Sequence, residues 1–150
     1  MPKQLHVVLE CVLSKNNNLL NFFSGAKHAA QRKVLQELGI KAKDCPIEQM
    51  KYLTRIHYFA KSGGSWAEHE MDYILFSKNK TNALPMEPNP EEVKNVMYLK
   101  MNDLEAFIKD VGEESVTPWF LLMAKTQLPN WWANIDDLDQ FVDHETIMRH

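Results

Sequence analysis

A run of alternating acids leads directly into an apolar segment, and this feature constrains the fold more than any other part of the chain. Glu68, Glu70 and Asp72 are spaced two residues apart, and the apolar run 73–76 follows at once. In a β-strand alternate side chains share one face, so the first two carboxylates project side by side, about 7 Å apart by the strand rise. The pattern predicts a strand that opens with an acidic face and continues into a protein core.

Two interpretations of this acidic face are open. Like charges at that spacing repel each other, and the burial of a carboxylate is costly. A bound divalent cation removes both costs, and carboxylate oxygens suit hard ions such as Mg²⁺ or Mn²⁺. The alternative is an edge strand whose acids are simply solvated.

The bulk composition limits the classes of function. The chain has 150 residues, 45% of them apolar and 25% charged, which fits one soluble α+β domain over residues 1–150. A net charge of −3 gives no footprint for nucleic acid, and no apolar run approaches the roughly 18 residues that cross a membrane. Two cysteines form no disulfide framework, so we expect a reducing compartment, by default the cytoplasm, with a peroxisomal location as the alternative. We expect a monomer.

The hydrophobic periodicity predicts alternating strands and helices. Strands are expected over residues 5–13, 19–23, 52–60, 66–77 and 93–99. Helices are expected over residues 27–38, 103–109 and 119–128, and a final amphipathic segment covers 135–148. Gly39 is expected to end the first helix. This order predicts a mixed β-sheet with helices packed on it.

Several blocks of the chain, in this order, resemble one enzyme family. The helix 29–40 resembles a degenerate Nudix box in which Glu37 is the retained acid. Six further blocks follow it, at residues 52–58, 66–75, 88–90, 117–120, 131–132 and 141–145. Together they resemble type I isopentenyl-diphosphate Δ-isomerases of the animal kind.

The resemblance implies a Nudix-like mixed sheet sandwiched by helices, and interconversion of isopentenyl and dimethylallyl diphosphate in isoprenoid biosynthesis. That reaction protonates an unactivated alkene and passes through a tertiary carbocation. It needs an acid in a dry pocket and an aromatic face for the cation. By correspondence with the family, Glu70 is the catalytic glutamate, Tyr58 is its hydrogen-bonding neighbour, and Trp119 faces the cation.

The resemblance also implies a metal site and a diphosphate site, with Mg²⁺ or Mn²⁺ as the cofactor and a small-molecule diphosphate as the partner. Glu68 and Glu70 correspond to metal ligands, and His6 corresponds to a metal-binding histidine. Glu37 matches an acid associated with a second, substrate-bound Mg²⁺. Lys33 stands where the family usually has a diphosphate-binding arginine, a change that keeps the charge but loses the bidentate fork.

One part of the family pattern is missing near residues 23–30. It would carry the catalytic cysteine, a metal-binding histidine and basic residues for the diphosphate, and neither Cys11 nor Cys45 occupies the cysteine's motif. Two alternatives to the isomerase therefore stay open. One is an impaired short form that binds diphosphates or a partner without turnover. The other is a Nudix hydrolase, which Lys33 and Gln36 disfavour because they stand where that box has glutamates.

Overall fold

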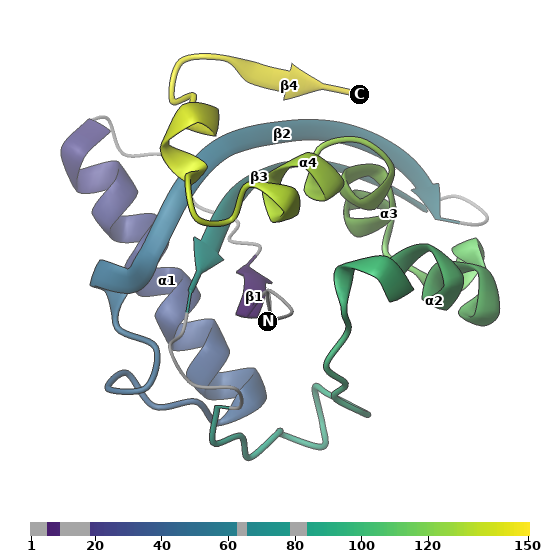
Figure 1. Ribbon diagram of the computed structural model, residues 1–150, viewed down its shortest axis with the longest axis horizontal. Coiled ribbons are helices and arrows are strands. Elements are labelled where there is room, and N and C mark those ends of the chain that lie inside the picture. Colours follow the sequence, from purple (N-terminus) through teal and green to yellow (C-terminus); the bar gives the residue numbers. More distant parts are fainter. Residues whose placement is uncertain (1–5, 10–18, 63–65, 79–83) are drawn as a thin grey trace.

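The centre of the fold is a long antiparallel hairpin of two strands, β2 (Met50–Ser62) and β3 (Trp66–Ser77). The computed structural model describes residues 6–9, 19–62, 66–78 and 84–150, and in it the two strands curve side by side through the molecule (Figure 1). Their register pairs Tyr58 with Glu70 and Ile56 with Asp72. The predicted strands 52–60 and 66–77 are thus confirmed.

Within the described ranges, two short strands complete a four-stranded mixed sheet of order β1–β3–β2–β4. The strand β1 (His6–Leu9) pairs antiparallel with β3, and β4 (Ile147–Arg149) pairs parallel with β2. Within the final segment, β4 follows a short 3₁₀ helix, Leu138–Phe141. The rest of the strand predicted over 5–13 lies outside the described residues, because they begin at His6 and break off after Leu9.

The first helix, α1 (Leu19–Leu38), begins earlier than predicted. The strand prediction for residues 19–23 is wrong, because these residues form the first turns of α1. Their apolar side chains recur every three or four residues, in phase with Ala26 and Ala30, and a short apolar run alone does not distinguish a strand from a helix. Gly39 ends α1 as predicted: its φ is 67°, and its amide donates to the carbonyl of Leu35 at 3.0 Å.

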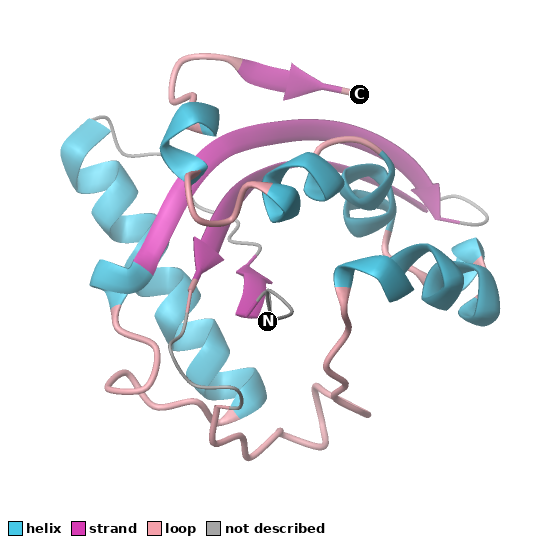
Figure 2. Ribbon diagram, in the orientation of Figure 1, coloured by secondary structure: helices cyan, strands magenta, loops and turns pink. Residues whose placement is uncertain are grey.

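Helices cover both faces of the sheet, as predicted (Figure 2). On one face, Ala30 and Val34 of α1 pack against Tyr73 and Leu75 of β3. Alternation along β3 turns Ile74 and its even-numbered neighbours to the other face, where the C-terminal helices pack. Which face a side chain occupies therefore decides which helices it meets.

Three helices cover that second face: α2 (Leu104–Val111), α3 (Pro118–Lys125) and α4 (Leu128–Ala133). The helix predicted over 119–128 corresponds to α3, which ends at Lys125, and Leu128 already begins α4. Trp131 and Trp132 of α4 are buried, and the Trp131 ring meets that of Phe76 at a centroid distance of 5.8 Å and an interplanar angle of 90°. None of the helices in the described ranges has the length and apolarity needed to cross a bilayer.

Residues 84–100 contain neither helix nor strand, so the strand predicted over 93–99 is wrong. A strand needs a partner for its backbone groups, and this segment is tied instead to the end of α1. The amides of Glu87 and Asn89 donate to the carbonyls of Leu38 and Glu37, at 2.9 and 2.8 Å. The apolar residues of 93–99 gave a strand-like pattern without a neighbouring edge to pair with.

Candidate active site

Tyr58, Glu68 and Glu70 meet on one face of the hairpin. The Tyr58 hydroxyl lies 3.1 Å from Oε2 of Glu68 and 3.4 Å from Oε2 of Glu70, and it acts as the donor to both. A phenol carries one proton, so it is donated to one carboxylate at a time. The structure therefore brings together three of the residues that the sequence predicted for the site.

The strand register explains why these groups meet. Tyr58 is directly opposite Glu70, and the regular alternation of β3 puts Glu68 on the same face. The Tyr58 side chain is only 3% exposed and belongs to the core cluster under the C-terminal helices, whereas both glutamates are partly buried. The three polar ends thus lie at the boundary between core and solvent.

Burial raises the pKa of Tyr58 above its ordinary value, and the negative charge of Asp72 raises it further. The hydrogen bond to Glu68 and the charges of the two glutamates act in the same direction. The phenol consequently stays protonated at physiological pH and remains a donor to the acids. Asp72 is completely buried on the same strand face. This burial was not predicted from the sequence, although the position of Asp72 directly before the apolar run was a signal for it.

Trp119 lies on the same side of the sheet as Tyr58. It follows Pro118, the first residue of α3, whose ring is compatible with a helix start. The Trp119 side chain packs against the core cluster that contains Tyr58, and its ring meets that of Phe120 at a centroid distance of 5.7 Å. An aromatic face is thus available on the side of the sheet that carries the acids.

Lys33 and Glu37 lie on the other side of the sheet. They form an ion pair on α1, with Nζ 2.7 Å from Oε1. Because α1 packs on the face opposite to Tyr58, the structure does not bring this pair together with Glu68 and Glu70. The roles predicted for Lys33 and Glu37 stay predictions.

His6 is also distant from the acids in this arrangement. Its backbone pairs with Ser77. A rise of about 3.4 Å per residue puts positions 70 and 77 of β3 roughly 24 Å apart along the strand. The ligand role predicted for His6 stays a prediction that this register does not support.

The acid pair alone fits part of a metal site. Among the described residues, no group of three or more His, Cys, Asp or Glu side chains is placed to hold a metal ion. Glu68 and Glu70 nevertheless lie close enough to share one hydroxyl, and carboxylate oxygens are the ligands that Mg²⁺ and Mn²⁺ prefer. Since Mg²⁺ keeps several waters and is often held by one or two carboxylates plus substrate phosphates, the donor set fits such an ion.

The cysteine that the structure describes is not beside the acids. Cys45 is fully buried before β2, and its Sγ lies 3.4 Å from Oγ of Ser77, at the far end of β3 from Glu70. Cys11 lies outside the described residues. In the described part of the chain, therefore, the acid–base chemistry next to Tyr58 comes from carboxylates.

His69 lies on the opposite face from its two acidic neighbours, because successive side chains of a strand point to opposite faces. Its ring meets that of His57 at a centroid distance of 4.7 Å and that of Phe59 at 5.8 Å. The two faces of this part of β3 thus carry different chemistry, carboxylates on one and imidazoles on the other.

The block at residues 141–145 holds a polar network to which the sequence assigned no role. Oδ1 of Asp143 accepts hydrogen bonds from the amides of Glu145 and Thr146, at 3.0 and 2.8 Å, and these bonds lower the pKa of Asp143. Arg55 donates to the carbonyls of His144 and Glu145 at 3.0 Å each. This network attaches the segment before β4 to β2. The short side chain of Asp143 just before a turn was the signal for it.

Comparisons with known proteins support the pattern seen in the sequence. A family model described as "NUDIX domain" matches residues 25–120. The chain is 45% identical to "Isopentenyl-diphosphate Delta-isomerase 1" of Mesocricetus auratus over 127 residues, which cover 83% of this chain and 55% of the relative. It is 45% identical to "Isopentenyl-diphosphate delta-isomerase" of Candida albicans over 149 residues, 97% of this chain and 52% of the relative.

A third relative, "Isopentenyl-diphosphate delta-isomerase" of Schizosaccharomyces pombe, is 41% identical over 135 residues, which cover 90% of this chain and 57% of the relative. The chain therefore spans about half the length of the curated relatives it matches.

Proposed function

Because the chain belongs to the Nudix family, we propose that it acts on isopentenyl diphosphate and interconverts it with dimethylallyl diphosphate. Two observations support this proposal. The relatives named for this isomerisation are 41 to 45% identical over most of the chain. The hydrogen-bonded cluster of Tyr58, Glu68 and Glu70 supplies an acid–base group at a partly buried position, which is the observation that carries the proposal.

The reaction adds a proton to the terminal carbon of the alkene. It removes another proton from the methylene next to the carbon that carries the diphosphate, so that the double bond moves by one place. We assign one of these two proton transfers to the Glu70 carboxyl group. Tyr58 orients that carboxyl through its hydroxyl and, because its pKa is raised, does not itself lose a proton. The indole of Trp119 supplies an aromatic face for the cationic intermediate.

A divalent ion, Mg²⁺ or Mn²⁺, belongs to the same proposal. Glu68 and Glu70 are the side chains that would hold it. When bound, the ion would offset the repulsion between the two carboxylates and neutralise charge on a diphosphate. The proposed diphosphate contact of Lys33 and the second metal contact of Glu37 are supported by their correspondence to the family motif alone.

The direct test is isomerisation of isotopically labelled isopentenyl diphosphate by the full chain with Mg²⁺, followed by NMR of the products. We expect dimethylallyl diphosphate from the unaltered chain, and a loss of at least about 100-fold in rate for Glu70→Gln, since a positioned acid–base group contributes roughly 10² to 10⁴. Glu92→Gln, an exposed acid in the 84–100 segment, is the matched control and should react normally. Product formation that does not depend on Glu70 would refute the assignment.

A second candidate is binding of the diphosphate without turnover. One observation favours it: within the described part of the chain, Cys45 lies at the far end of β3 from Glu70. Calorimetric titration with isopentenyl diphosphate and Mg²⁺ separates the candidates. Heat of binding without product supports the second, whereas neither heat nor product excludes both.

A further inference from the structure

A cavity lies at the other end of the hairpin from the acid cluster. It has a volume of about 530 Å³, within the range of small-molecule sites. Its apolar wall includes the buried side chains of Met50, Phe76, Ile135 and Leu138. Along β2, position 50 is roughly 25 Å from position 58 by the strand rise, so the cavity is distinct from the proposed active site.

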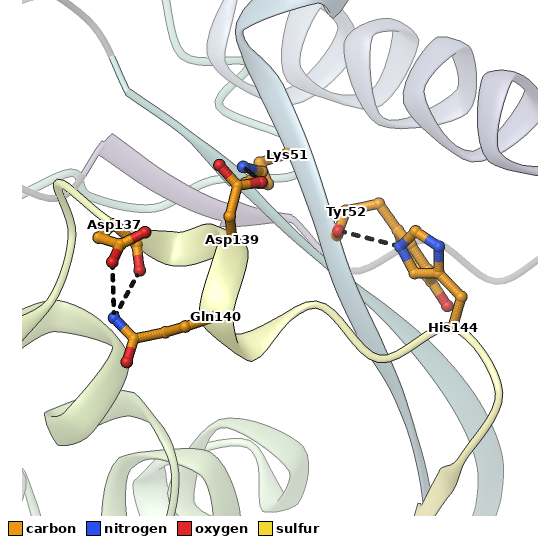
Figure 3. A network of polar contacts seen from close by, with 6 residues as sticks. All are labelled: Lys51, Tyr52, Asp137, Asp139, Gln140 and His144. Atoms are coloured by element: carbon orange, nitrogen blue, oxygen red, sulfur yellow. Dashed lines mark hydrogen bonds and ion pairs between the residues drawn. The ribbon is translucent and has the colours of Figure 1, made fainter.

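Three lysines from separate parts of the chain line this cavity: Lys27 from α1, Lys51 from β2, and Lys78 directly after β3. Lys51 forms an ion pair with Asp139, which lies beside it in Figure 3, and Lys78 forms one with Asp136. These pairs hold the two ammonium groups at the cavity. Within the described residues, Lys27 has no ion-pair partner.

The lining charges balance, since Glu48 and the two aspartates match the three lysines in number. The balance does not remove the hydrogen-bonding capacity of the lysines. An ammonium group has three donors, and each aspartate occupies only part of them. Lys27 and the remaining donors of Lys51 and Lys78 can therefore bind an anion, whereas Glu48 opposes it.

The segment 135–144, which carries the aspartates paired with Lys51 and Lys78, is held in place by further contacts. Nε2 of Gln140 donates to the carbonyl and to Oδ2 of Asp137, at 2.9 and 3.2 Å (Figure 3). The ring of His144 lies against that of Tyr52, with centroids 4.9 Å apart, and its Nε2 is 3.5 Å from the Tyr52 carbonyl oxygen. The segment 135–144 is thus fixed to β2 and forms a stable side of the cavity.

We propose that this cavity binds an amphipathic phosphate ester, with the phosphate at Lys27, Lys51 and Lys78 and the apolar body along Phe76, Ile135 and Leu138. A phosphate monoester carries about 1.5 to 2 negative charges at pH 7 and three acceptor oxygens, so three ammonium groups favour a phosphate head over a singly charged carboxylate. The apolar wall gives affinity to an alkyl or alkenyl chain that inorganic phosphate lacks. The site does not depend on the function proposed above.

The test is calorimetric titration of the full chain with octyl phosphate below its micelle concentration, and with octanol, octanoate and inorganic phosphate. We expect octyl phosphate to bind at least tenfold more tightly than octanol or inorganic phosphate, and more tightly than octanoate. Equal affinity for octanol and octyl phosphate would reduce the site to an apolar cavity. Equal affinity for octanoate would overturn the preference for phosphate.

Variants locate the binding. Lys27→Gln and Lys78→Gln should each weaken octyl phosphate about five- to tenfold, and Glu48→Gln should strengthen it, while Lys43→Gln, an exposed lysine that does not line the cavity, is the control. Thermal melts confirm that each variant folds. If Glu70→Gln weakens binding and Lys27→Gln does not, the phosphate occupies the proposed active site and the inference is wrong.

Discussion

The hydroxyl of Tyr58 lies 3.1 Å from Oε2 of Glu68, on the strand beside it, and the same hydroxyl reaches Glu70. One proton thus serves two carboxylates. The proton stays on the tyrosine because burial and the nearby acids all raise the pKa of Tyr58. The hydroxyl acts as a fixed donor that orients both carboxyl groups.

Tyr58→Phe should lower the isomerisation rate by roughly 10- to 100-fold, because the carboxyl of Glu70 loses its orienting donor. The free energy of unfolding should change by no more than about 1 kcal/mol, the usual worth of one hydrogen bond. Rate measurements and urea unfolding check both values. Tyr98→Phe is the matched control, since Tyr98 is half exposed and outside the cluster; an equal rate loss there would contradict the assignment.

Glu68→Gln should weaken Mn²⁺ binding at least about tenfold, because an amide is a poorer ligand than a carboxylate for a hard cation. Electron paramagnetic resonance of free Mn²⁺ measures the affinity directly. Glu92→Gln, an exposed acid far from β3 in sequence, should bind like the unaltered chain. Unchanged Mn²⁺ affinity in both Glu68→Gln and Glu70→Gln would show that the ion binds elsewhere or not at all.

Gly39→Ala should destabilise the protein by about 1 to 3 kcal/mol, since φ there is 67° and a Cβ would lie 2.5 Å from the carbonyl oxygen of Glu87. Gly25→Ala in α1 is the matched control. A Cβ at position 25 meets nothing within 4 Å, so alanine should stabilise the helix by roughly 0.5 to 1 kcal/mol. Urea unfolding of both variants checks the opposite signs, and destabilisation of similar size at both positions would be inconsistent with the backbone argument.

Asp143→Asn should lower the melting temperature at pH 7, because the two amide hydrogen bonds favour the charged carboxylate. These bonds lower the pKa of Asp143 in the folded state, so their contribution is present above the unfolded pKa of about 3.9 and is lost as pH falls through the folded value. Melting curves between pH 7 and pH 2 should therefore converge for the two proteins at the acid end. A difference that grows toward low pH would have the wrong sign.

The hairpin and its acid cluster could be predicted from the sequence because their signals are local. The alternation of Glu68 and Glu70 indicates the face they share. The resemblance to the family predicts Tyr58 beside them, and the register that pairs Tyr58 with Glu70 agrees with that prediction. The secondary-structure predictions are wrong where contacts with residues distant in sequence determine the local structure. Residues 19–23 and 93–99 carry apolar patterns compatible with a strand, and only the neighbouring chain decides otherwise.

The same limit applies to the site. The four-residue spacing of Lys33 and Glu37 predicts their ion pair on α1, but it does not indicate which face of the sheet α1 covers. The burial of Asp72 and the cavity lined by Lys27, Lys51 and Lys78 likewise depend on packing between distant segments. The roles predicted for Lys33 and Glu37, the single domain over 1–150 and the monomeric state stay predictions.

Alternation along β3 also has a practical meaning for metal-binding measurements. The rings of His57 and His69 lie together on the reverse side from the carboxylates, and imidazole favours zinc, nickel and copper. A zinc titration would consequently report on both faces, because zinc binds carboxylate oxygens as well as imidazole nitrogens. Mg²⁺ and Mn²⁺, which prefer oxygen ligands, report on the carboxylate face selectively.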